Sequence, residues 1–168
     1  MKIKRKIANL IQPKKNFITK KRLREDEIDF ERLRSYRFDR VRKELEKNNL
    51  EACILFDPVN VRYALDSLNM SVYNMHNLTR YCFIPVYGPT ILYEYFNCEI
   101  LSDHLNLIDE IRPAITWDYF SNGDQASNQL DKWIKEVKDL SSLYFKSKKI
   151  AIDVLNGPAV SLLNKEGI

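Results

Sequence analysis

Glycine, proline and histidine are all scarce in this sequence of 168 residues, and each scarcity excludes a class of protein. With only 4 glycines and 6 prolines, the chain is neither collagen-like nor of low complexity. No GxGxxG, P-loop or GxSxG motif occurs, so the sequence predicts no phosphate-binding loop and no serine-hydrolase nucleophile. The two histidines, His76 and His104, belong to no HExxH or clustered Cys/His pattern, so they predict no zinc site.

Long apolar runs and paired cysteines are missing as well. No run approaches the roughly 20 apolar residues that span a bilayer. Bases open the chain without an apolar stretch behind them, so we expect no secretory leader. Cys53, Cys82 and Cys98 are odd in number and widely spaced, which favours free thiols in a reducing compartment. The sequence therefore predicts a cytoplasmic protein.

Charge divides the chain into two parts. Residues 1–24 hold ten Lys or Arg and no acid, whereas residues 25–168 hold 17 bases and 23 acids. We expect a basic, flexible arm over 1–24 and one globular domain over 25–168. The open alternatives for the arm are a solvated extension, binding of nucleic acid through its phosphates, binding of an anionic membrane, or organelle targeting.

Short predicted helices and strands alternate along the chain after the arm. Apolar residues at helical spacing end at Asn48-Asn49, an apolar run at 52–56 suits a buried strand, and Asp57-Pro58 suits a helix start. Further along we expect a hairpin over 81–95, helices at 99–105, around 130–137 and at 158–163, strands at 115–119 and 149–154, and a turn at 121–124. This order predicts an α/β domain with a mixed β-sheet flanked by helices. Gly167 suits a helix end and Ile168 a new strand, so we expect the polypeptide to continue.

Residues 66–80 differ from their surroundings. They show neither helical nor strand period, and they are rich in polar and aromatic side chains. A loop of this length between regular elements is usually functional or disordered, and its Met, Tyr and His content argues against disorder. The sequence predicts that this irregular loop is the functional surface.

A family resemblance rests mainly on Asp57-Pro58-Val59-Asn60-Val61-Arg62-Tyr63. This motif follows the predicted helix Arg37–Leu45 and the segment Leu50-Glu51-Ala52 in the sequence. This pattern resembles the amino-terminal domain of the creatinase/prolidase superfamily of metalloenzymes, over roughly residues 30–168. The resemblance implies a mixed sheet with a ribonuclease-H-like motif. From the residues themselves we expect Asp57 to cap its helix, Tyr63 to face the sheet, and Arg62 to cap or bridge.

The segment after Tyr63 departs from the Leu-Thr-Gly pattern of the superfamily's peptidases. Asp66-Ser67-Leu68-Asn69-Met70, Tyr73-Asn74, His76-Asn77 and Arg80 look more like the branch that contains dimethylsulfoniopropionate lyases. Tyr93-Glu94-Tyr95 and the segment 119–124 agree with the same branch.

The resemblance implies a homodimerising, pocket-shaping domain of a metalloenzyme that acts on a small molecule or peptide. We expect an Xaa-Pro peptidase-like hydrolase, with a metal-dependent dimethylsulfoniopropionate lyase as the alternative. The superfamily's dinuclear divalent metal belongs to a carboxy-terminal catalytic domain that these 168 residues lack, so we expect no cofactor, metal ligand or catalytic residue here. A second alternative is a standalone binding module whose basic arm engages nucleic acid or an anionic surface.

The resemblance also implies that the 66–80 loop reaches the substrate pocket. Tyr73 would form an aromatic wall that offers a sulfonium cation a cation–π contact, Arg80 would pair with a carboxylate, and His76 would exchange hydrogen bonds. The alternatives are purely structural roles, in which Arg80 anchors the loop and Tyr73 packs beneath it. The candidate substrate-binding residues are Asp66, Asn69, Tyr73, His76, Asn77 and Arg80.

Overall fold

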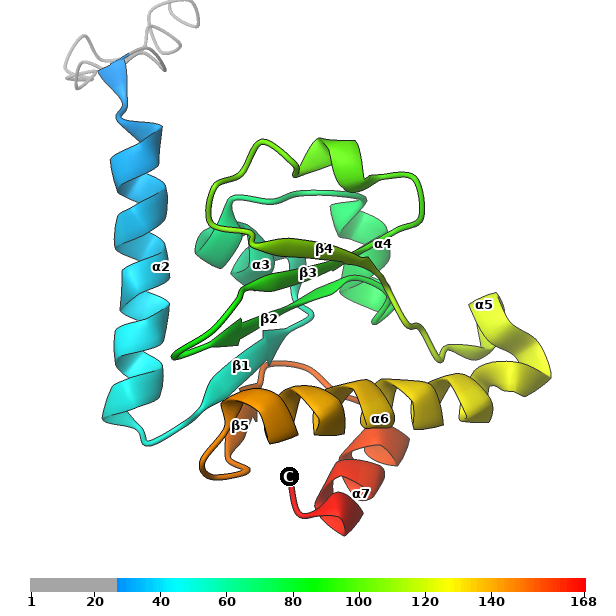
Figure 1. Cartoon of the computed structure of the whole chain (residues 1–168). Coiled ribbons are helices and arrows are strands. Elements are labelled where there is room, and N and C mark those ends of the chain that lie inside the picture. The colour runs from blue at the N-terminus through cyan, green and yellow to red at the C-terminus, as the bar shows by residue number, and fades with distance from the viewer. Residues whose placement is uncertain (1–26) are drawn as a thin grey trace, which may run out of the picture.

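A computed structural model describes residues 27–168, in which five strands form one mixed sheet (Figure 1). The strand order is β4-β3-β2-β1-β5, with antiparallel pairs β1–β2 and β2–β3 and parallel pairs β1–β5 and β3–β4. The strands are β1 Ala52–Leu55, β2 Tyr81–Pro85, β3 Ile91–Glu94, β4 Glu110–Pro113 and β5 Ile150–Ile152. The predicted α/β fold is confirmed, whereas the basic arm 1–24 lies outside the described residues.

Helices cover both faces of this sheet. They are α2 Phe30–Lys47, α3 Pro58–Leu65, α4 Ser71–His76, α5 Tyr119–Asn122, α6 Ala126–Tyr144 and α7 Gly157–Glu166, with single 3₁₀ turns η2 Glu99–Leu101 and η3 Gly123–Gln125. Side chains of β1 alternate between two cores, Ala52 and Ile54 facing one and Cys53 and Leu55 the other. The first core packs against α6 and α7, and the second against α2 and α3.

The Asp57–Tyr63 motif forms the junction between β1 and α3. The Asp57 carboxylate accepts hydrogen bonds from the backbone N–H groups of Val59, at 2.7 Å, and Asn60, at 3.1 Å, which confirms the predicted cap. The Asn60 side chain donates to Asp153, just after β5, at 3.0 Å. The motif therefore ties the start of α3 to the two adjacent parallel strands.

Tyr63 does not face the sheet, contrary to expectation. Val61, Ala64 and Leu65 are the α3 residues buried toward the sheet, and the helical period places Tyr63 on the side toward α2. The Tyr63 ring lies beneath the guanidinium of Arg37, 5.5 Å from its centre. The Arg62 carbonyl accepts from the backbone N–H of Asp66 at 2.9 Å. Its exposed side chain has no hydrogen-bond or ion-pair partner within residues 27–168, so the expected side-chain cap or bridge is absent there.

The 66–80 segment is not wholly irregular, because it contains the helix α4. Six residues make fewer than two turns, too few for a helical period to show in the sequence. Met70 precedes the helix in the left-handed conformation, with φ of 41°, and gives it no side-chain cap. The signals that mark a helix start are therefore missing from the sequence here.

Three other expectations between residues 99 and 124 are wrong. The expected helix 99–105 is only the 3₁₀ turn η2, and the expected turn 121–124 lies within α5 and η3. The strand near Pro113 is β4, which precedes the expected 115–119. β4 is an edge strand, where charged side chains and proline are tolerated, so it lacks the apolar run of a central strand.

The three cysteines sit in unequal surroundings, which gives a testable prediction. Cys53 and Cys82 are buried, and burial raises the pKa of the Cys53 thiol to about 12 and that of Cys82 well above its usual value. Because the thiolate is the reacting species, we expect Ellman's reagent at pH 8 to modify only partly exposed Cys98 rapidly. Denaturant should release all three thiols, and Cys98→Ser should abolish the fast phase. Equal native rates for all three would contradict the described burial.

Candidate functional site

Two connections meet above one end of the central strands. Residues 66–80 link α3 to β2, and residues 95–102 follow β3; we call them the paired loops (Figure 1). The hydroxyls of Ser67 and Ser102 are 2.7 Å apart and both are buried. On the other side, the hydroxyls of Thr79 and Tyr95 are also 2.7 Å apart. The paired loops therefore form one unit held together by hydrogen bonds.

A buried ion pair forms the base of this unit. Arg80 Nε donates to Glu94 Oε2 at 2.7 Å, and each side chain is 1% exposed. Arg80 also donates from Nη2 to the Ser67 hydroxyl. The other Glu94 oxygen, Oε1, accepts from Asn69 Nδ2 at 3.0 Å and from the backbone N–H of Tyr95 at 2.8 Å. A buried charge is tolerated only when it is paired and hydrogen-bonded, and this cluster meets both conditions.

A second polar cluster centres on the buried side chain of Asn74. The Tyr95 hydroxyl donates to Asn74 Oδ1 at 2.6 Å, and the single Thr79 hydroxyl proton goes either to the same Oδ1, at 3.1 Å, or to the Tyr95 oxygen, at 2.7 Å. Asn74 Nδ2 donates to the carbonyl of Asn69 at 2.6 Å. Burial raises the pKa of the Tyr95 hydroxyl, which keeps it protonated and able to donate. The cluster fixes the orientation of α4 against the end of β3.

The six predicted site residues separate into three groups. Asn69 and Arg80 belong to the buried base, and Arg80 turns toward Glu94 instead of solvent. Tyr73 is half-buried with its ring 6.5 Å from that of Tyr95, and Asn77 donates to the Tyr73 carbonyl at 3.2 Å. His76 is exposed at the end of α4. The Asp66 carboxylate belongs to neither polar cluster and instead pairs with Arg34 of α2 at 2.9 Å.

Ser67, Ser102 and Glu94 were not among the predicted site residues. A signal for Glu94 exists in the hairpin: Tyr81 pairs with Tyr93, so Arg80 and Glu94 stand opposite each other at its end. An acid and a base facing each other at adjoining strand ends predict an ion pair. The Ser67–Ser102 contact joins residues 35 apart in sequence and carries no comparable signal.

Apolar side chains project from the surface of the paired loops. The exposed fraction is 57% for Met70, 75% for Val72, 60% for Met75, 77% for Phe96 and 74% for Ile100. Several exposed apolar residues on two adjoining segments are typical of a surface that contacts protein or ligand. The site thus combines a rigid polar base with an apolar outer surface.

Among residues 27–168, no group of three or more His, Cys, Asp or Glu side chains is placed to hold a metal ion. Arg80 and Glu94 neutralise each other within the buried base, so their geometry suits orientation of the loop more than proton transfer. Within the same residues, no helix is long and apolar enough to cross a bilayer.

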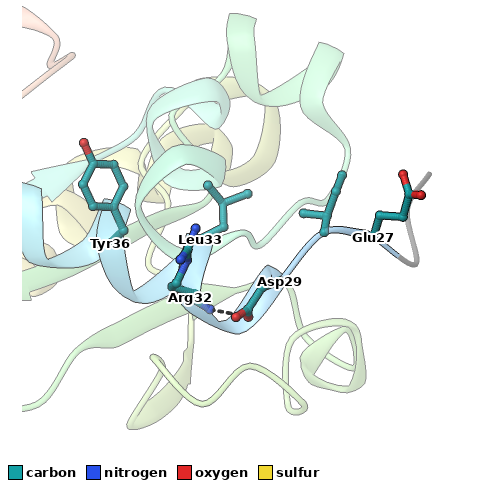
Figure 2. Close-up of a pocket in the computed structure, with 6 residues that line it drawn as sticks. Glu27, Asp29, Arg32, Leu33 and Tyr36 are labelled. Carbon is teal, nitrogen blue, oxygen red and sulfur yellow. Dashed lines mark hydrogen bonds between the residues drawn. The ribbon is translucent and has the colours of Figure 1, made fainter. Parts of the chain in front are cut away.

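A cavity of about 570 Å³ lies apart from the paired loops, beside the first turns of α2. Figure 2 shows its lining, including Asp29, which accepts a hydrogen bond from the backbone N–H of Arg32 at 2.9 Å. This bond is the N-terminal cap of α2. None of the six predicted site residues lines this cavity.

Two known proteins are similar in sequence to this chain. They are the dimethylsulfoniopropionate lyases DddP of Roseovarius nubinhibens and of Roseobacter denitrificans, each 32% identical over 112 residues. The match covers 67% of this chain and 25% of each lyase, so the chain spans about a quarter of the length of these curated relatives. No protein-family model matches the chain. The similarity supports the relation to the creatinase/prolidase superfamily that the motifs predict.

Proposed function

We propose that this chain is the amino-terminal, pocket-shaping part of a metal-dependent enzyme of the creatinase/prolidase type. The observation that carries the proposal is the pair of loops, which places a rigid polar base beneath an apolar outer surface. Such a surface suits contact with the catalytic part of the same protein or of a second subunit. We further propose that the protein works as a homodimer in the cytoplasm, where thiols such as the buried Cys53 and Cys82 stay reduced.

We propose lyase chemistry on a sulfonium substrate in preference to Xaa-Pro hydrolysis. The similarity to two dimethylsulfoniopropionate lyases supports this choice, as does the departure from Leu-Thr-Gly after Tyr63. The dinuclear metal of the superfamily does not fit the described residues, since no suitable group of ligands occurs among them. As the family resemblance implies, we propose that the metal and the bond-breaking step belong to a separate catalytic domain.

The loop residues receive unequal roles in this proposal. The half-buried ring of Tyr73, next to that of Tyr95, would offer a face to the sulfonium cation. Exposed His76 would exchange hydrogen bonds with the substrate or with water, and Asn77 would hold the end of α4. Asn69 and Arg80 would act as positioning residues through Glu94, because their polar atoms are engaged there. Asp66 would lie outside the substrate pocket and hold the start of the loop to α2, since its carboxylate pairs with Arg34.

The test is a substrate comparison on the whole natural protein, loaded with a divalent metal. We expect release of dimethyl sulfide from dimethylsulfoniopropionate and no hydrolysis of an Xaa-Pro dipeptide. If the protein hydrolysed only the dipeptide, the proposed role of this chain within a metalloenzyme would stand, and the proposed lyase reaction would be contradicted. Turnover of neither substrate would contradict the proposed function.

A variant tests the proposed aromatic wall. A cation–π contact contributes about 0.5–2 kcal/mol, so Tyr73→Leu should raise KM roughly 2- to 30-fold with a smaller change in kcat. The matched control is Tyr87→Leu, because Tyr87 is 75% exposed and its hydroxyl bonds to Glu46 of α2, away from the paired loops. Equal KM values for the two variants would exclude Tyr73 from the substrate site.

A further inference from the structure

A cavity of about 400 Å³ lies between α2 and α3, on the side of α3 away from the sheet. Three arginines line it, Arg34 and Arg37 from α2 and Arg62 from α3, together with one acid, Asp66. We call this cavity the arginine groove. Its volume falls within the range of small-molecule sites.

Within the part of the chain that the structure describes, only Arg34 of these three arginines has its charge balanced by acidic side chains. Arg34 pairs with Asp66 Oδ2 at 2.9 Å and with Glu31 Oε1 at 3.0 Å. Within residues 27–168, no acid lies at ion-pair distance from Arg37 or Arg62. The groove therefore carries two unbalanced guanidinium groups. This excess is local, since residues 27–168 hold 17 Lys or Arg against 21 Asp or Glu.

The guanidinium of Arg37 lies over an aromatic ring. It is 5.5 Å from the centre of the Tyr63 ring, and the side chain is partly buried. Stacking on an aromatic face restricts the guanidinium plane and leaves its N–H edges free to bind carboxylate or phosphate with two hydrogen bonds. Arg62 directly precedes Tyr63 and lines the same cavity, which makes it the second arginine there without an acidic partner among the described residues.

The rest of the lining is partly apolar. Phe30 is 39% exposed, Val59 62% and Tyr63 38%, so these side chains can cover an organic body attached to the anionic group. We propose that the arginine groove binds a small organic anion, with its carboxylate or phosphate held by Arg37 and Arg62 and its body against Phe30 and Tyr63. Of the paired loops only Asp66 lines this site, and the site would be present whichever reaction the whole protein catalyses.

The test is calorimetric titration of the full chain with phenyl phosphate, benzoate and neutral benzyl alcohol at constant ionic strength. We expect saturable 1:1 binding of at least one anion and none of the alcohol. Arg37→Gln/Arg62→Gln should weaken that binding at least tenfold. The matched control Lys43→Gln/Lys47→Gln removes the same charge from exposed positions of α2 and should leave the affinity unchanged. The anion that binds more tightly shows whether the groove prefers a phosphate or a carboxylate group.

A second measurement needs no variant and so is independent of how the variants fold. Phenylglyoxal modifies accessible guanidinium groups, and peptide mapping reports each site. Phenyl phosphate or benzoate should slow modification of Arg37 and Arg62 while exposed Arg32 reacts at an unchanged rate. The proposal is overturned if neither anion binds saturably, if both double variants lose affinity equally, or if all three arginines are protected alike.

Discussion

Replacing Arg80 with methionine is expected to destabilise the chain by about 3–5 kcal/mol, because it leaves the Glu94 carboxylate buried without its partner. Both side chains are 1% exposed, so water cannot replace the lost ion pair without opening the paired loops. A loss of this size is a large fraction of the roughly 5–15 kcal/mol that stabilises an ordinary domain. The free energy of unfolding in urea measures it directly.

Two further variants separate the ion pair from general damage to the loop. The double variant Arg80→Met/Glu94→Leu should recover part of the loss, because it removes the uncompensated charge but leaves Asn69 Nδ2 and the Tyr95 N–H without their acceptor. The matched control Lys135→Met breaks the exposed Lys135–Asp139 pair of α6 and should cost at most about 0.5 kcal/mol. If Arg80→Met cost no more than the control, the described burial of the pair would be wrong.

Replacing Trp133 with alanine should destabilise the chain by about 3–5 kcal/mol through the loss of packing against the first core. Trp133 is fully buried on α6, with its ring centre 4.6 Å from that of Trp117 and 6.1 Å from that of Phe56. Truncation leaves a cavity that these rings cannot fill. For a chain of this size, such a loss lowers Tm by about 6–20 °C.

The same helix offers a control for this second prediction. Leu143 also lies on α6 but is 71% exposed, so Leu143→Ala should change stability by no more than about 0.5 kcal/mol. Thermal unfolding followed by circular dichroism compares the two variants. A Tm for Trp133→Ala within 2 °C of the unchanged protein would contradict the placement of α6 over the sheet.

The fold could largely be predicted where local signals and burial agree. The apolar run at β1 and the Asp57-Pro58 start of α3 specify their elements within a few residues. The spacing of Trp133 and Val137 identifies α6 as a helix but not its full extent, Ala126–Tyr144. α4 and β4 were missed because their formation depends on tertiary contacts. Asn74 fixes α4 from inside a hydrogen-bond cluster, and β4 is an edge strand without an apolar run.

The candidate site was predictable as a segment but not as an arrangement. The composition of residues 66–80 identified the loop, yet it could not show that Arg80 turns inward to Glu94 or that Asp66 turns to Arg34. The first pairing is contained in the hairpin register, so a sequence argument could have reached it. The second depends on how α2 packs beside α3, which no local pattern specifies. The same packing creates the arginine groove.

Native mass spectrometry of the protein isolated from its source tests the central claim most directly, since it reports polypeptide mass, subunit number and bound metal together. We expect a subunit much heavier than the 19.9 kDa of this chain, present as a dimer, with divalent metal lost on acidification. That result would agree with a pocket-shaping part of a larger metalloenzyme. A metal-free 19.9 kDa species would contradict the account and favour a standalone binding protein.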